Sequence, residues 1–274
     1  MPVIAVINRK GGSGKSTVAT HVAASLARAG QSVMLGDVDR QQSSRAWLRR
    51  RSRLDPAQAP PIQGWIVDKL SVARPPAGVG HLVLDTPGGL TGFELARLVM
   101  WCDAILIPVC DSRFDRDSAA ACHEELAALP RVANGRCKVG VLGMRVDRRT
   151  RGHAALESWA AEQGMDFLGS LRDTQLYVHC ADRGLTVFDL PAAKAAADTE
   201  EWKPLLAWLE KAAAAAPKPP APDAAPRVVP SPAARTHRVA LSTPSTLEAD
   251  VSELSLSGVA KPGFWGALRR LLRR

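Results

Sequence analysis

Residues 3–17 read Val-Ile-Ala-Val-Ile-Asn-Arg-Lys-Gly-Gly-Ser-Gly-Lys-Ser-Thr, and this stretch decides the fold. The apolar, β-branched run Val3–Ile7 predicts a strand, and the Ala/Val/Leu pattern from Val18 to Ala29 predicts a helix. Between them the glycines of Lys10–Thr17 let successive backbone N–H groups turn toward one point. The positive end of the following helix adds to the attraction for an anion. The stretch therefore predicts a phosphate-binding loop.

Each polar residue of this loop has an expected role in binding a nucleoside triphosphate. Lys15 is expected to reach the β- and γ-phosphates, Ser16 to ligate Mg²⁺, and Thr17 to bond the α-phosphate. The predicted nucleotide-binding residues are Gly11, Gly12, Ser13, Gly14, Lys15, Ser16 and Thr17.

Two further apolar runs end in carboxylates. Asp37 and Asp39 close the run that starts at Val33, and their i, i+2 spacing places both on one side of a strand. Asp85 closes the run His81–Asp85, where it is expected to hold Mg²⁺ through water. Ser16 and Asp85 are therefore candidate Mg²⁺ ligands, with Asp85 acting through water.

The loop departs from the usual phosphate-binding pattern at its first residue. Arg9 stands where that pattern opens with a glycine, and a second lysine, Lys10, follows it. This variant resembles the deviant loop of the ParA/MinD family of P-loop ATPases, and the pattern is closest to short ParA-like partitioning ATPases. Residues 40–44 look like that family's Asp-Pro-Gln-Gly switch, with Arg40 replacing the proline. Residues 185–189 resemble its adenine-side loop, whereas Met144 replaces the asparagine of an Asn-Arg-x-Asp segment.

The resemblance implies a mechanism and a set of partners. ATP and Mg²⁺ are the expected cofactors, and ATP would be hydrolysed to ADP and phosphate in a nucleotide-dependent homodimer. Lys10 would reach the nucleotide of the other protomer, Lys15 its own nucleotide, and Asp39 would orient the attacking water. Asp37 would support the Mg²⁺ shell through water, so that the implied metal set is Ser16, Asp37 and Asp85. Hydrolysis would position a cargo, which could be a plasmid, a chromosome region or a protein complex, through an adaptor or ATPase-stimulating partner.

Two other functions stay open on the sequence. A MinD-like ATPase that cycles on a membrane would use the C-terminal segment as its working surface. A metabolic P-loop enzyme related to nitrogenase reductase would share the deviant loop. The cysteines lack the paired spacing suited to a shared iron–sulfur cluster, which disfavours the redox branch of that class.

Beyond the loop, predicted strands and helices alternate with short connections. Besides the runs already named, the predicted strands are 62–67, 104–109, 138–143 and 167–170, and the predicted helices are 45–53, 92–101, 115–129, 150–163, 174–183 and 192–211. This order predicts an α/β fold with a mostly parallel sheet, helices on both faces and the nucleotide at the carboxyl ends of the strands. Proline-rich sequence begins after Lys211. The predicted organisation is an ATPase domain over 1–211, a flexible Pro/Ser/Thr-rich linker over 212–257 and a short basic segment over 258–274.

The composition indicates the kind of binding partner and the cellular compartment. The 274 residues carry a formal charge of +9 and five scattered cysteines. No charged-then-apolar signal segment and no run of about 18 apolar residues is present, and unpaired cysteines suit a reducing cytosol. Arginine clusters at 45–53 and 145–151 favour nonspecific contact with DNA phosphates. We therefore expect a cytoplasmic, nucleoid-associated protein.

The last residues form a pattern of their own. On a helix, Phe264, Leu268, Leu271 and Leu272 would share one face, and four arginines would lie largely on the other. This pattern is typical of a short interfacial helix on anionic lipid. Residues 264–274 therefore predict, as an alternative, peripheral contact with the inner membrane, or docking of a partner.

Overall fold

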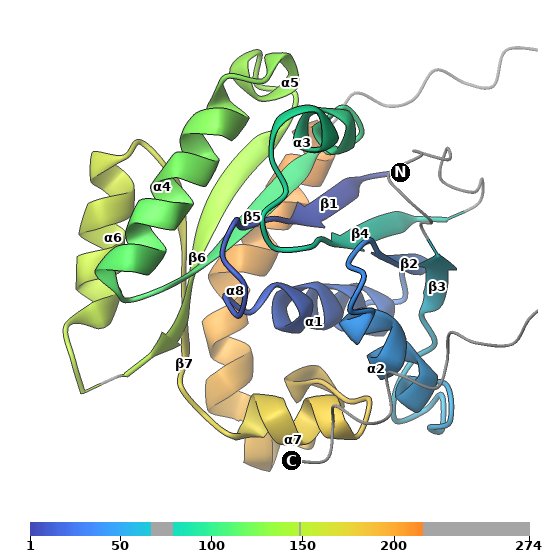
Figure 1. Ribbon diagram of the computed structural model, residues 1–274. Coiled ribbons are helices and arrows are strands. Elements are labelled where there is room, and N and C mark those ends of the chain that lie inside the picture. Colours follow the sequence, from blue (N-terminus) through green and yellow to red (C-terminus); the bar gives the residue numbers. More distant parts are fainter. Residues whose placement is uncertain (67–78, 148, 216–274) are drawn as a thin grey trace, which may run out of the picture. The chain divides into compact units, whose positions relative to one another are not determined.

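All strands of the described residues run parallel in one sheet, in the order β3-β2-β4-β1-β5-β6-β7 (Figure 1). The computed structural model describes residues 1–66, 79–147 and 149–215. The strands are β1 Val3–Val6, β2 Val33–Asp37, β3 Gln63–Ile66, β4 His81–Asp85, β5 Ala104–Cys110, β6 Lys138–Val146 and β7 Asp166–Arg172. The helices are α1 Lys15–Arg28, α2 Ser43–Arg51, α3 Gly92–Val99, α4 Arg113–Ala127, α5 Pro130–Ala133, α6 Gly152–Glu162, α7 Leu176–Asp182, the 3₁₀ turn η1 Val187–Asp189 and α8 Ala192–Ala215.

Apolar side chains on both faces of the sheet explain why helices cover it on both sides. Along β1 and the residue after it, Ile4 and Val6 pack with α1 and α8, whereas Val3, Ala5 and Ile7 pack with α3, α4 and α6. This alternation follows from the two-residue period of a strand. Strands buried on both faces are typical of parallel sheets. The predicted fold class, a parallel sheet between two helical layers, is confirmed.

The element order also follows the prediction, with three differences. The strand from Lys138 runs on to Val146, because that segment continues to pair with β5 and β7. The turn α5 was not predicted, since four residues are too few to show a helical period. Helix α8 continues to Ala215, so the predicted linker does not begin at 212; a run of alanines has the highest helix propensity of any sequence.

The rest of the linker and the segment 258–274 lie outside the described residues. Within the described residues, no helix combines the length and the apolarity needed to cross a bilayer. The five cysteines are free thiols, four of them buried and Cys110 half-buried.

Candidate active site

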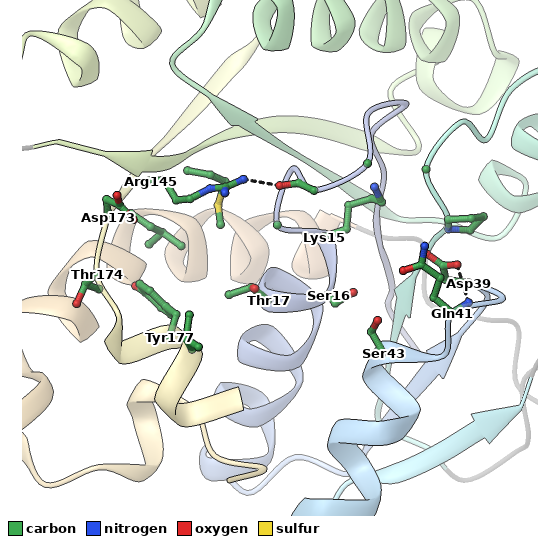
Figure 2. Close-up of a pocket in the computed structure, with 18 of the residues that line it drawn as sticks. Lys15, Ser16, Thr17, Asp39, Gln41, Ser43, Arg145, Asp173, Thr174 and Tyr177 are labelled. Atoms are coloured by element: carbon green, nitrogen blue, oxygen red, sulfur yellow. Dashed lines mark hydrogen bonds between the residues drawn. The ribbon is translucent and has the colours of Figure 1, made fainter. Parts of the chain in front are cut away.

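A cavity of about 960 Å³ opens where the loop between β1 and α1 meets the C-terminal residues of β6 and β7 and the segments that follow β2, β4 and β7. These segments leave the carboxyl ends of parallel strands, which is where α/β proteins bind their ligands. Figure 2 shows the phosphate-binding loop between two walls. One wall carries Asp39, Gln41 and Ser43; the other carries Arg145, Asp173, Thr174 and Tyr177.

The phosphate-binding loop has the predicted shape. Gly14 adopts φ +96°, and α1 begins at the next residue, Lys15. The Lys15 ammonium donates to the carbonyl oxygen of Lys10 at 2.9 Å. Burial lowers the pKa of Lys15, while the carboxylates of Asp85 and Asp39 act in the opposite direction. The loop thus presents a cation and the N-terminus of a helix to the same space, as an anion site requires.

Most of the predicted loop residues face the cavity. Those that line it are Gly11, Gly12, Gly14, Lys15, Ser16 and Thr17. Ser13 is buried instead, and its hydroxyl has no partner within the described part of the chain.

In the single chain, the Lys10 side chain points away from the cavity. It is not among the described residues that line the cavity, and its ammonium pairs with Asp115 Oδ1 at 2.9 Å. Burial alone would raise the pKa of Asp115, but hydrogen bonds from Ser112 and Lys10 lower it. Asp115 lies in the first turn of α4, so Lys10 is held beside that helix. Its expected contact with a second protomer's nucleotide stays a prediction.

Arg9 connects the loop to two helices. Its guanidinium pairs with Glu125 of α4, and the other Glu125 oxygen accepts the backbone N–H of Gly92, the first residue of α3, at 2.6 Å. The residue that replaces the usual opening glycine therefore joins the loop to α3 and α4, two of the helices that cover this face of the sheet.

Asp85 is the most deeply buried carboxylate of the site. Its Oδ2 accepts a hydrogen bond from Ser44 Oγ at 2.7 Å, while Oδ1 is buried and has no hydrogen-bond partner among the described residues. Burial raises its pKa to about 6, against the lowering effect of the Ser44 and Ser16 hydroxyls. An unsatisfied buried carboxylate oxygen beside a serine hydroxyl is a suitable donor set for Mg²⁺, which prefers oxygen ligands and keeps several waters.

Asp37 and Asp39 have different surroundings. The oxygens of Asp37 accept the backbone N–H groups of Asp39 at 3.1 Å and Arg45 at 2.9 Å. Burial raises the pKa of Asp37, and these amides oppose the shift. Asp39 lines the cavity and accepts the backbone N–H of Gln41 at 3.0 Å. Asp37 therefore shapes the segment that presents Asp39, and its role near Mg²⁺ stays a prediction.

On the wall opposite Asp39, the position of one arginine differs from the sequence prediction. Arg145, assigned from sequence to a DNA-binding cluster, adopts φ +53°, lines the cavity and donates to the carbonyl oxygen of Gly12. Arg148 lies outside the described residues, and Arg149 pairs with Asp147 at 2.8 Å. The predicted cluster is therefore divided, because the end of β6 turns Arg145 inward over the loop.

The predicted adenine-side loop, 185–189, is not among the described residues that line the cavity. It is buried under α1, where His21 accepts the backbone N–H of Val187 at 3.3 Å and Trp47 donates to the carbonyl oxygen of Leu185 at 3.1 Å. The corresponding wall is formed instead by residues 171–175, 177 and 178, and Met144 packs against the Gly14 backbone.

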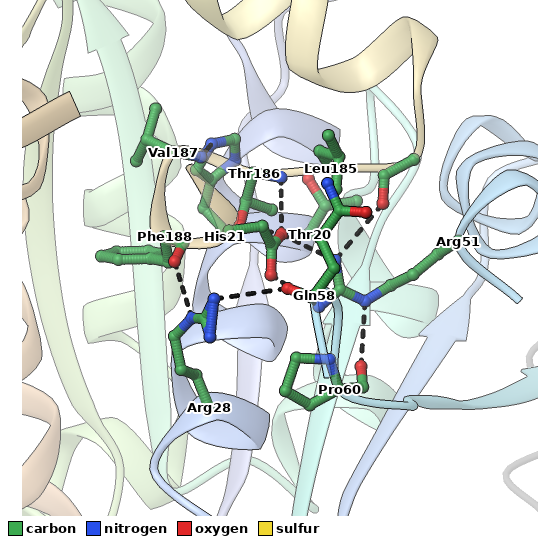
Figure 3. A network of polar contacts seen from close by, with 12 residues as sticks. Thr20, His21, Arg28, Arg51, Gln58, Pro60, Leu185, Thr186, Val187 and Phe188 are labelled. Carbon is green, nitrogen blue, oxygen red and sulfur yellow. Dashed lines mark hydrogen bonds and ion pairs between the residues drawn. The ribbon is translucent and has the colours of Figure 1, made fainter. Parts of the chain in front are cut away.

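A polar network beneath the loop shows that the prediction for the other arginine cluster, at 45–53, also needs correction (Figure 3). Arg51 is buried and pairs with both oxygens of Asp189, at 2.8 and 3.0 Å. It also donates to the carbonyl oxygens of Pro60 and Gly184. Gly184 packs tightly there, since a Cβ atom at this position would lie 2.4 Å from the backbone nitrogen of Arg51. Arg51 is therefore a buried structural residue, whereas Arg49, Arg50 and Arg53 are exposed.

Three contributors to the site were missed from sequence: Ser44, Glu125 and the wall 171–178. Ser44 is interpreted from sequence only as part of the switch-like segment 40–44, and no sequence signal distinguishes Glu125 from other helix carboxylates. Only the position of residues 171–178, directly after a predicted strand, could have indicated that they line the cavity.

Comparison with known proteins identifies the family. Residues 4–187 match the model described as the CobQ/CobB/MinD/ParA nucleotide binding domain. The chain is 30% identical over 200 residues to the maintenance of carboxysome distribution protein A of Halothiobacillus neapolitanus, covering 71% of this chain and 91% of that protein.

Two solved structures share the fold. An ATP complex of a Cyanothece McdA variant has a TM-score of 0.59 and 16% identity, over 78% of this chain and 96% of the other. A plasmid partition protein of Borrelia burgdorferi bound to AMPPNP has a TM-score of 0.56 and 17% identity, over 77% of this chain and 99% of the other.

Proposed function

Because this chain belongs to the ParA/MinD family of nucleotide-binding proteins, we propose that it is an ATPase that positions a cargo inside the cell. One observation carries the proposal: a single cavity brings together a cation-bearing phosphate loop, Asp39 and the segments after β4 and β7. The relative in Halothiobacillus neapolitanus is named for distributing carboxysomes, which supports a protein assembly as the cargo.

The residues divide the work of phosphoryl transfer. Lys15 and the loop amides neutralise phosphate charge, and Asp39 orients the attacking water from its own wall of the cavity. Ser16 and Asp85 would hold Mg²⁺, which supplies charge neutralisation when bound. Such transfer depends on positioning and electrostatics more than on covalent chemistry.

A second copy of the chain is the proposed partner of the ATP-bound state. In the single chain Lys10 is paired with Asp115 and lies away from the cavity lining. Across a dimer it would add positive charge to the nucleotide of the other protomer. Hydrolysis would remove the γ-phosphate that holds Lys10 there and loosen the dimer, giving a switch that a cargo-bound partner can stimulate.

We also propose that the dimer binds DNA without reading its sequence. The exposed arginines of α2 lie beside Arg183, because Arg50 donates to the carbonyl oxygen of Ala181 at 3.2 Å and Gly184 abuts the α2 backbone. The proposed contact surface is Arg49, Arg50, Arg53 and Arg183. Phosphate contacts of this kind would place the protein on the nucleoid.

ATP hydrolysis and binding to duplex DNA test these proposals. The wild-type chain should hydrolyse ATP and bind duplex DNA more tightly with ATP than with ADP. Replacing Arg49 and Arg53 by Glu should weaken binding to all sequences alike and reduce its salt dependence, with nucleotide binding unchanged. DNA binding that survives both substitutions would reject this surface.

The amphipathic pattern of residues 264–274 supports the membrane-cycling alternative. Deleting 264–274 should leave ATP hydrolysis unchanged and abolish binding to anionic liposomes. Leu268→Glu breaks the apolar face and keeps all four arginines, so lipid binding retained in this variant would mean that the segment acts only through charge. Absence of any liposome binding by the wild-type chain would reject the alternative.

A further inference from the structure

The hydroxyl of Ser44 holds one oxygen of the buried Asp85 carboxylate. Ser44 is completely buried, and its Oγ donates to Asp85 Oδ2 at 2.7 Å across 41 residues of sequence. The other oxygen, Oδ1, has no hydrogen-bond partner among the described residues. The Ser44 bond therefore restricts rotation of the carboxyl group and leaves Oδ1 as its free oxygen.

The first turn of α2 is attached to the sheet at a second point. The backbone N–H of Arg45 donates to Asp37 Oδ2 at 2.9 Å. Asp37 and Asp85 end neighbouring strands and stand opposite each other in the register of β2 and β4. Ser44 and Arg45 thus bridge two strand ends, directly after the segment in which Asp39, Gln41 and Ser43 line the cavity.

We propose that Ser44 is a positioning residue for the Mg²⁺ ion that accompanies the nucleotide. By holding Oδ2, Ser44 keeps Oδ1 of Asp85 available to the shell of the ion, which Ser16 also enters. This inference rests on the proposed nucleotide-binding function. Hydrogen-bond partners of metal-binding carboxylates commonly change metal affinity by about 10–100-fold when removed. Ser44 also makes the ion site and the Asp39 wall parts of one rigid unit.

A purely structural role for Ser44 predicts a different result. Loss of the hydroxyl would then loosen α2 and weaken nucleotide binding to the same extent with and without Mg²⁺. A positioning role affects only the part of the affinity that Mg²⁺ contributes. The ratio of two dissociation constants therefore separates the two roles.

The experiment measures binding of fluorescent mant-ADP to the full chain, once with Mg²⁺ and once with EDTA. Ser44→Ala should weaken binding at least tenfold with Mg²⁺ and less than twofold with EDTA. Ser52→Ala removes a serine hydroxyl at the other end of α2, where Ser52 donates to the carbonyl oxygen of Arg49, and should change neither value. Ser44→Thr keeps the donor and should restore most of the Mg²⁺ effect.

Three results would overturn the inference. One is a Ser44→Ala protein with the wild-type ratio of the two constants, and another is an equal loss in both. If Ser44→Ala does not fold, Ser44→Cys takes its place, and a full Mg²⁺ effect with this weaker donor counts against the role. A wild-type chain that binds mant-ADP in neither condition would refute the proposed function itself, and that result is distinct from the other three.

Discussion

Replacing Arg51 by Ala should destabilise the folded chain severely, because it leaves a buried charge without its partner. Arg51 and Asp189 side chains are 2% and 0% exposed, and two hydrogen bonds join them. After truncation, Asp189 keeps only the N–H and the hydroxyl of Thr186 as donors. Breaking such a buried pair costs about 3–5 kcal/mol. For a folded part of this size, that corresponds to a fall in Tm of about 6–20 °C.

The charge state of Asp189 adds a pH signature. Burial raises the pKa of Asp189, but Arg51 and Thr186 outweigh this effect and keep it below its ordinary value. In wild type this carboxylate therefore contributes stability above its ordinary pKa, and that contribution is lost as the pH falls. Without Arg51, burial should raise the pKa of the carboxyl group, so the deficit of the variant should shrink toward acid pH.

Urea unfolding and thermal unfolding, each followed by circular dichroism, measure the effect. Arg49→Ala is the matched control, since Arg49 lies on the same helix and is exposed, and it should leave the unfolding midpoint unchanged. Replacing both partners of the pair by apolar residues should cost less than Arg51→Ala, because no lone charge remains. A loss of stability below about 1 kcal/mol in Arg51→Ala would refute the reasoning. It would mean that the buried pair contributes little to the stability of the folded chain.

Three shorter predictions concern the loop and its support. Lys15→Ala should abolish nucleotide binding, whereas Lys10→Ala should retain it and lose ATP-dependent dimerisation; dimers of normal affinity, measured by light scattering, would exclude the role across the interface. Asp39→Ala should trap the ATP-bound dimer by slowing hydrolysis, and turnover near wild type in a phosphate-release assay would move the water-orienting role elsewhere. Burial lowers the pKa of His21 to about 4, so the folded state favours the neutral ring, which accepts the Val187 N–H. Stability should therefore be complete above pH 6.5 and fall by about 3 kcal/mol between pH 6.5 and 4. His21→Phe should flatten this slope in unfolding titrations, and an unchanged slope would assign the effect to other groups.

The sequence predicted those features that depend on local pattern. The phosphate loop is continuous in sequence, so the positions of Lys15, Ser16 and Thr17 followed from one strand–turn–helix unit. Buried parallel strands appear in the sequence as short apolar runs, which is why their positions along the chain could be predicted. Asp85 was found because it ends such a run.

The features that sequence could not predict are contacts between distant segments. A row of arginines in α2 reads as a solvated helix face, and nothing local distinguishes Arg51 from its exposed neighbours. Its burial depends on Asp189, 138 residues further along the chain. In the same way, Arg145 comes after the strand predicted from sequence, like any surface arginine. Only its φ of +53° near the end of β6 brings it over the loop.

The pairing of β1 has a consequence for the order in which the chain folds during synthesis. β1 holds the loop and is made first, yet it lies in the middle of the sheet, between β4 and β5. Its partners in register are Leu82 to Asp85 on one side and Ala104 to Leu106 on the other. A nascent chain shorter than about 106 residues therefore cannot complete the pairing of its first strand. Until then the apolar residues of β1 need cover from the ribosome surface or from chaperones. Pausing of translation beyond β5 should favour productive folding, whereas pausing before β4 should favour aggregation.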